Sequence, residues 1–306
     1  MRRAAEESTA GAAAELWRLP AAALAARVAR GELHAAAAVE SALARIHDVN
    51  PAVQAIARPF AEQARAAAAE LDRRLAAGQE CGPLSGVPFT VKANIDVAGF
   101  PTTHGVPALR EAVAPRDAPL VRRLREAGAI PVGHSNMPDL ALRFHTHSQL
   151  FGATLNPWDR SLSPGGSSGG EGVALATGMS ALGLGNDAGG SVRLPALFGG
   201  VAALKPGFGR FPSDRSVGPR DPTLASQLIP VDGLLARSVA DLQLALQVLA
   251  GPEACDPRAA PVPVFGPPLD RPLRVAVDAD PGRLGVDPSV RGAVEAAAAV
   301  LEKAGY

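Results

Sequence analysis

Two serines set among glycines, and one lysine in an apolar run, are the residues whose types and spacing could do chemistry. Ser167 lies in the segment 163–171, SPGGSSGGE, and Ser191 ends the segment 186–191, NDAGGS. A serine hydroxyl becomes a nucleophile when a base takes its proton, and a lysine is such a base only when burial favours its neutral form. Lys92 follows the apolar run GVPFTV. Because glycines let backbone N–H groups approach a reacting oxygen, the pattern indicates a serine hydrolase that works without histidine.

The composition is that of an ordinary globular protein. Hydrophobic residues make up 47% of the 306 positions and charged residues 20%, which suits one large domain or two modest ones. The formal net charge is zero and only 4% of residues are aromatic, so nothing favours nucleic acid or an anionic membrane as a partner. Cys81 and Cys255 lack the spacing of a disulfide framework or a zinc site. We therefore expect a cytoplasmic protein without a bound metal.

Helical sequence precedes a region in which strands and helices alternate. Between about Leu16 and Gly78, Gly31 breaks the first helix and Asn50-Pro51 ends the second. Short apolar runs bounded by Gly and Pro then predict buried strands, and their alternation with helices predicts an α/β protein. The expected strands are 87–91, 129–132, 180–184, 201–204 and 273–277, and the expected further helices are 62–75, 119–127, 169–177, 239–250 and 288–304.

The glycine-serine segment is open to other interpretations. It could be a flexible linker, but it leads directly into an apolar helix, which Ser168 and Glu171 begin with the spacing of a capping box. Its G-x-S-x-G spacing matches a nucleophile elbow, although the polar, proline-ended stretch before it makes a poor central strand. Residues 183–188, GLGNDA, match a dinucleotide fingerprint without the later acidic residue. His145 and His147 lack the further ligands of a metal site.

The sequence resembles the amidase signature family at several segments, which occur along the chain in the family's order. Several motifs in order are more specific than any one of them, and together they cover most of the chain. The matching segments are 86–96 (GVPFTVKANID), 156–159 (NPWD), 163–171 (SPGGSSGGE), 182–195 (LGLGNDAGGSVRLP), 199–206 (GGVAALKP) and 231–241 (VDGLLARSVAD).

The resemblance implies a Ser-cisSer-Lys triad. Ser191 would attack the amide carbonyl, Ser167 would follow a cis peptide bond and pass the proton onward, and Lys92 would be the base. Asp187 and Arg193 would brace the loop without taking part in the chemistry. The oxyanion would be stabilised by the backbone N–H groups around Ala188, Gly189, Gly190 and Ser191.

Two departures from the family pattern bear on this chain. Family members commonly carry an acidic residue after the lysine, where Ala93 stands here. They also have a further C-terminal region that completes the sheet, so we expect a C-terminally truncated chain with an open sheet edge. We expect residues 1–306 to form a single amidase signature domain, with an N-terminal helical segment 1–80, a catalytic core 81–250 and an incomplete C-terminal portion 251–306.

The function implied by the resemblance is hydrolysis of a small carboxylic amide to an acid and ammonia or an amine. This chemistry requires no cofactor, and the expected partner is a small-molecule amide substrate. A homodimer is compatible with the resemblance. Two alternatives stay open: the glutamine-hydrolysing subunit of a tRNA-dependent amidotransferase, and an inactive truncated fragment. Glu171 and the segment Asn186–Ala188 favour a stand-alone amidase over the amidotransferase subunit.

Overall fold

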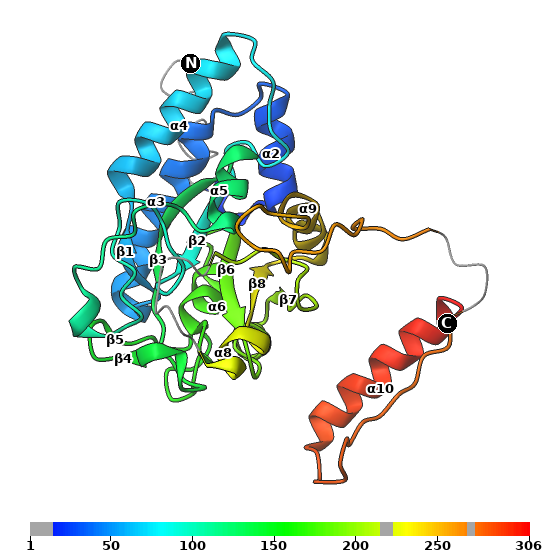
Figure 1. The fold of residues 1–306 in the computed structure, drawn as a ribbon. Helices are drawn as coiled ribbons and strands as arrows, with labels where there is room; N and C mark the ends of the chain where they lie inside the picture. The colour runs from blue at the N-terminus through cyan, green and yellow to red at the C-terminus, as the bar shows by residue number, and fades with distance from the viewer. Residues whose placement is uncertain (1–14, 215–222, 268–272) are drawn as a thin grey trace, which may run out of the picture. The chain divides into compact units, whose positions relative to one another are not determined.

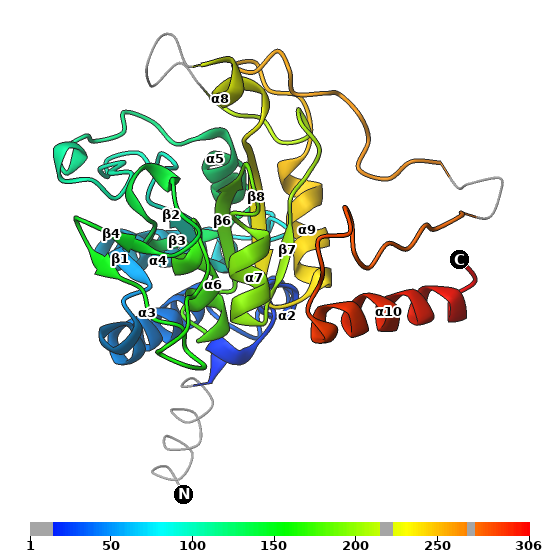
Figure 2. The same ribbon diagram turned by 90° about the horizontal axis from the view of Figure 1, so that it is seen from below.

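A mixed β-sheet brings together the chain segments that carry the expected site. The computed structural model describes residues 15–214, 223–267 and 273–306. Within them, the main sheet has the strand order β1-β3-β2-β6-β8-β7 (Figures 1 and 2). β2 is parallel to β3 and β6, whereas β1, β8 and β7 are antiparallel to their neighbours. The strands are β1 (Ile56–Pro59), β2 (Pro88–Lys92), β3 (Ile130–Ser135), β6 (Leu182–Asp187), β7 (Ala202–Leu204) and β8 (Val231–Ala236), with a separate pair β4 (His147–Ser148) and β5 (Gly152–Ala153).

Helices cover both faces of this sheet. α2, α5 and α9 share one hydrophobic cluster with the sheet. α3, α4, α6 and α7 contribute to the clusters on the opposite face, where α6 and α7 lie side by side (Figure 2). The helices are α2 (Ala21–Ala29), α3 (Ala35–Val53), α4 (Ala61–Ala76), α5 (Pro119–Glu126), α6 (Gly169–Ala176), α7 (Arg193–Gly199), α8 (Leu224–Leu228), α9 (Val239–Leu249) and α10 (Pro288–Lys303), with 3-10 turns at Leu16–Arg18, Pro107–Leu109 and Asp139–Ala141.

Strand alternation decides which side chains of β2 can take part in chemistry. Successive residues of a strand point to opposite faces of the sheet. Phe89 and Val91 belong to the cluster with α5 and α9. Thr90 and Lys92 therefore point to the face that α6 covers, and all four side chains are buried. The strand thus places one lysine inside the molecule beneath a helix.

The expected fold class is confirmed: the chain is α/β, with a mixed central sheet and helices on both faces. Most expected elements are present within a few residues of their predicted bounds. β1 and β8 were not expected. β8 contains Asp232 and Gly233, which interrupt the apolar pattern of a buried strand. It pairs along its whole length with β6, so its neighbours stabilise a strand that its own sequence does not favour.

Three local predictions are wrong. α3 continues through Pro51 to Val53, and Gln54 closes the helix in a left-handed conformation. The capping box at α6 does not form: Ser168 makes no side-chain cap, and Glu171 instead reaches beneath the sheet. Residues 273–277 form no strand, because no neighbouring strand pairs with them in the described part of the chain.

The described residues divide into two compact units. One extends to Val264 and holds the sheet, and the other runs from Phe265 to Tyr306 and holds α10. None of the residues of α10 is buried. The internal boundaries expected near residues 80 and 250 stay a prediction.

Candidate active site

Lys92 ends β2 and is fully buried. Its Nζ lies 2.7 Å from Ser167 Oγ and donates a 2.7 Å hydrogen bond to Asn186 Oδ1. Burial has the largest influence on this amine and lowers its pKa from 10.5 to about 7, although nearby carboxylates act to raise it. Near neutral pH, a substantial fraction of Lys92 is therefore the uncharged base.

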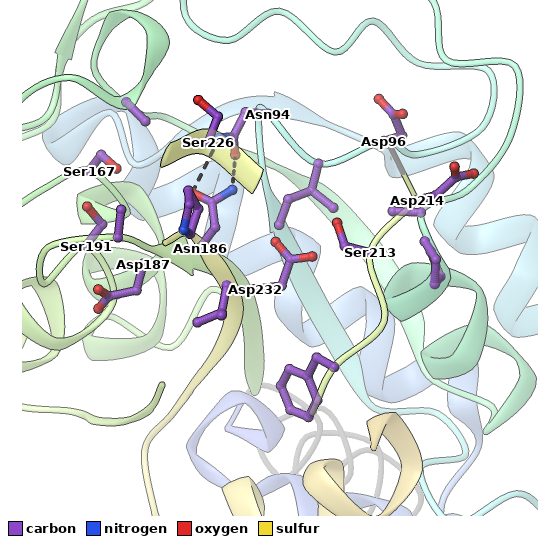
Figure 3. Close-up of a pocket in the computed structure, with 18 of the residues that line it drawn as sticks. Asn94, Asp96, Ser167, Asn186, Asp187, Ser191, Ser213, Asp214, Ser226 and Asp232 are labelled. Carbon is purple, nitrogen blue, oxygen red and sulfur yellow. Dashed lines mark hydrogen bonds between the residues drawn. The ribbon is translucent and has the colours of Figure 1, made fainter. Parts of the chain in front are cut away.

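Asn186 orients the lysine amine. The Asn186 side chain donates from Nδ2 to Asn94 Oδ1 at 2.9 Å, and Asn94 Nδ2 donates in return to Asn186 Oδ1 at 3.4 Å (Figure 3). A neutral amine has two N–H groups and one lone pair. Asn186 Oδ1 accepts one N–H of Lys92, which leaves the second N–H and the lone pair of the neutral amine; the lone pair is the group that can take the proton of Ser167, 2.7 Å away.

Ser167 follows the cis peptide bond between Gly166 and Ser167 that the resemblance implies. The residue is fully buried in the turn that leads into α6. Gly166 has no space for a side chain, since a Cβ there would lie 2.6 Å from the backbone carbon of Phe144. The next amide, Ser168 N–H, donates to the Ser191 carbonyl oxygen at 3.1 Å, which ties the two serine-bearing segments together.

Ser191 lies in the turn between β6 and α7, and Asp187 holds that turn. Asp187 Oδ1 accepts from Gly190 N–H at 2.7 Å and Oδ2 accepts from Val192 N–H at 3.1 Å. The Arg193 guanidinium donates to Oδ1 at 2.9 Å and to Oδ2 at 3.1 Å. Burial acts to raise the pKa of Asp187, but these hydrogen bonds, chiefly that of Arg193, outweigh it and hold the pKa at about 2. A buried, charged carboxylate therefore shapes the turn that presents Ser191.

The amides around Ser191 could receive a developing negative charge. Gly190 N–H is already committed to Asp187, so it is not free to bind another oxygen. In the described part of the chain, the N–H groups of Ala188, Gly189 and Ser191 donate to no protein acceptor. Gly190 also has a φ of +122°, which a side chain would strain. The turn thus leaves three of the four expected amide donors available.

A cavity of about 580 Å³ opens onto both serines. Figure 3 shows Ser167 and Ser191 at one end of it, with Asp96 and Asp214 at the other. Further lining residues follow β2, lie around 140–142 and in the ranges 208–214 and 226–232, and include Ala118, Pro119, Asp256 and Arg258. Its volume falls within the range of pockets that bind small organic molecules.

The structure brings Lys92, Ser167 and Ser191 to one site, braced by Asp187 and Arg193. Sequence reasoning missed the Asn186–Asn94 pair that orients the lysine, although Asn186 precedes Asp187 and Asn94 lies two residues after Lys92 in segments already singled out. Among the described residues, no group of three His, Cys, Asp or Glu side chains is arranged to hold a metal ion. No helix in that part of the chain is long and apolar enough to cross a membrane.

Comparison with known proteins identifies the family to which this site belongs. A sequence model of the amidase family matches residues 37–306. The chain belongs to the amidase signature family. It is 42% identical over 291 residues to an indoleacetamide hydrolase of Bradyrhizobium diazoefficiens, which covers 95% of this chain and 56% of that protein. It is also 42% identical over 282 residues to a glutamyl-tRNA(Gln) amidotransferase subunit of Symbiobacterium thermophilum, covering 90% of this chain and 56% of that one.

Solved structures give the same assignment. The structure of 6-aminohexanoate cyclic dimer hydrolase complexed with substrate matches with a TM-score of 0.82 and 33% identity, over 95% of this chain and 60% of that one. The peptide amidase from Stenotrophomonas maltophilia matches with a TM-score of 0.70 and 34% identity, over 81% of this chain and 51% of that one. The chain spans about half the length of the curated amidase signature relatives that it matches.

Proposed function

We propose that this chain hydrolyses a small carboxylic amide to an acid and ammonia or an amine, through a Ser-cisSer-Lys triad and an acyl-enzyme. The observation that carries the proposal is the distance of 2.7 Å between Lys92 Nζ and Ser167 Oγ. The lysine is fully buried, and burial lowers its pKa to about 7. Ser191 lies in the same pocket, on a turn tied to the Ser167 segment. A buried base, a relaying hydroxyl and a nucleophile are what acyl transfer without histidine requires.

In the first half-reaction, Ser191 Oγ forms a bond to the carbonyl carbon of the amide. Its proton passes to Ser167 Oγ while the Ser167 proton passes to Lys92 Nζ, and the carbonyl π electrons move onto oxygen. The free amides of Ala188, Gly189 and Ser191 stabilise that oxyanion, an effect worth about 3–4 kcal/mol per donor in comparable sites. When the intermediate collapses, the C–N bond breaks, and the leaving nitrogen takes back a proton from Lys92 through Ser167.

The second half-reaction repeats the same proton path with water. Water adds to the acyl carbon and gives up its proton to Lys92 by way of Ser167. The C–O bond to Ser191 then breaks, and Ser191 Oγ regains a proton from the same relay. The products are the carboxylic acid and a free enzyme in its starting protonation state.

The substrate proposed is a small carboxylic amide that fits the 580 Å³ cavity. A second candidate is glutamine, as the ammonia donor of a tRNA-dependent amidotransferase. It is favoured by the 42% identity to a relative that belongs by name to such an enzyme. Ammonia release from glutamine that depends on added partner subunits would support this second candidate, whereas release from simple amides by the chain alone supports the first. The cytoplasmic location and the homodimer stay predictions.

The proposal is tested by labelling the purified chain with a fluorophosphonate, which reacts with an activated serine. We expect one adduct, on Ser191, detected by intact mass and mapped by peptide digestion. Lys92→Ala should remove it because both hydroxyls then stay protonated, and Ser167→Ala should slow it. Ser163→Ala is the matched control: this serine precedes the same glycines but only accepts a 3.1 Å bond from Gly165 N–H. Folded wild-type chain that takes up no label would refute the proposal and support the inactive alternative.

A further inference from the structure

Glu171 is a buried carboxylic acid to which the proposed mechanism gives no role. It lies in the first turn of α6, four residues after Ser167, and its exposed fraction is 0%. Its carboxyl points beneath the sheet, between β2 and β6. Space for it exists because Gly183, on β6, has no side chain: a Cβ there would lie 2.3 Å from Glu171 Oε2. The fold therefore keeps room for a charged group directly under the strand that ends at Lys92.

The polar contacts of Glu171 leave it incompletely satisfied. Thr90 Oγ1 donates to Oε2 at 2.5 Å, and Thr90 is also 3.1 Å from the hydroxyl of Ser180. Ser135 pairs with Lys92 across β3 and β2, and its hydroxyl also lowers the pKa of the Glu171 carboxyl. Neither Ser135 Oγ nor Glu171 Oε1 has a hydrogen bond of normal geometry in the described residues. Burying an acid in this way carries a cost, which a nearby cation can offset.

In the described part of the chain, the cation whose charge acts on the Glu171 carboxyl is Lys92. Thr90, which binds the carboxyl, is two residues before Lys92 on β2, so both side chains point to the same face. Among the carboxylates that raise the pKa of Lys92, Glu171 has the largest effect. Burial raises the pKa of Glu171 to about 7, against the hydroxyls of Thr90 and Ser135 and the charge of Lys92, which lower it.

We propose that Glu171 is a positioning residue for the proton relay: its carboxylate stabilises the ammonium form of Lys92 while Ser191 attacks. The inference rests on the proposed function. When Lys92 takes up a proton, a positive charge appears on a fully buried side chain. The carboxylate of Glu171 lies under the same strand, on the face to which Lys92 points, and compensates that charge without a direct hydrogen bond to the amine in the described residues. Glu171 touches no reacting atom and acts through the lysine alone.

The other charged groups around Lys92 are less suited to this role. Asp187, on β6, is held in a bidentate pair with Arg193. Asp232, on β8, raises the pKa of the lysine less than Glu171 does. His104, which lines the pocket, has its pKa lowered by burial and so adds no positive charge near neutral pH.

The first test is the pH dependence of Ser191 labelling by the fluorophosphonate in Glu171→Gln. Glutamine keeps the shape and the acceptor for Thr90 but has no charge. Without the carboxylate, we expect the labelling midpoint to move about one pH unit toward acid and the high-pH rate to fall about tenfold. Ser180→Ala is the matched control, because it removes a neutral hydroxyl from the same buried cluster; its midpoint should not move. A slower Glu171→Gln with an unmoved midpoint would overturn the inference and leave only a structural role.

The second test does not depend on activity. In the chain labelled with ¹³C at the glutamate carboxyl, one carbon should titrate near pH 7, unlike exposed glutamates. In Lys92→Met, loss of the cation should raise that midpoint by about one pH unit. An unmoved midpoint would overturn the inference even if Glu171→Gln failed to fold. If wild-type chain shows the linked titration but no labelling, the proposed function fails while the coupling of Glu171 to Lys92 stands.

Discussion

Replacing Asp187 by asparagine should loosen the turn that carries Ser191. Both carboxylate oxygens accept hydrogen bonds: Oδ1 from Gly190 N–H and Arg193, and Oδ2 from Val192 N–H and Arg193. An asparagine has only one acceptor oxygen, so either orientation of its amide places an NH₂ group against at least two donors. The substitution therefore removes a buried charge and also leaves donors without an acceptor.

The size of the effect follows from the pKa of Asp187. Its pKa of about 2 lies below the ordinary 3.8, so the folded state favours the charged form. That gap corresponds to about 2 kcal/mol of stability, fully present above about pH 4 and lost as pH falls toward 2. The unpaired donors add about 1 kcal/mol that does not depend on pH. We expect Asp187→Asn to lower the free energy of unfolding by about 3 kcal/mol at pH 7.

The assay is urea unfolding followed by circular dichroism at a series of pH values from 7 to 3. The difference between wild type and Asp187→Asn should be constant down to about pH 4 and shrink below it. Asp159→Asn is the control, because Asp159 is exposed and its carboxylate accepts, among the described residues, only from Ser161; it should change stability little. A loss of stability under 1 kcal/mol at pH 7, or a loss that does not shrink in acid, would refute the conclusion that the charged carboxylate of Asp187 stabilises this turn.

Three further predictions concern the same site. Ser191→Ala should abolish fluorophosphonate labelling while shifting the thermal midpoint by less than about 2 °C, because its hydroxyl makes no hydrogen bond to the described residues; residual labelling would remove the nucleophile assignment. Since the uncharged form of Lys92 is the base and its pKa is about 7, labelling should be half-maximal near pH 7 and fall about tenfold per unit in more acid solution; a flat profile would contradict this. Gly183→Ala should destabilise the fold by about 1–3 kcal/mol in urea unfolding because its Cβ meets Glu171, whereas Gly207→Ala, with open space around it, should be nearly neutral.

The sequence made the reactive side chains easier to predict than their supports. Lys92, Ser167 and Ser191 stand in glycine-rich or apolar segments whose spacing is itself unusual. The contacts of Asn186 were not predictable, because they join residues 92 positions apart and depend on the register of β2 with β6. Glu171 was misread for a related reason. Its spacing from Ser168 suits a helix cap, but the buried hydroxyl of Thr90, on a strand 81 positions away, binds it instead, and the local sequence pattern carries no information about that contact.

The same limit applies to the strands. The apolar runs that became β2, β3 and β6 could be predicted because burial on both faces demands apolar residues. β8 contains an aspartate and a glycine, and only its pairing with β6 and β7 makes it a strand. Residues 273–277 show the converse, since a strand-like sequence does not form a strand where the described chain offers no partner.

Because Lys92 is completely buried, the reactivity of its amine measures how often the structure around it opens. The sequence contains only three lysines, and the other two, Lys205 and Lys303, are half-buried and exposed. An amine-reactive ester should therefore acylate those two lysines more readily than Lys92. Lys92 should react only as often as the segments around β2 separate to admit the reagent. Mass-resolved acylation at one lysine would thus measure how frequently the interior of the site becomes accessible to solvent, without a substrate and without any introduced probe.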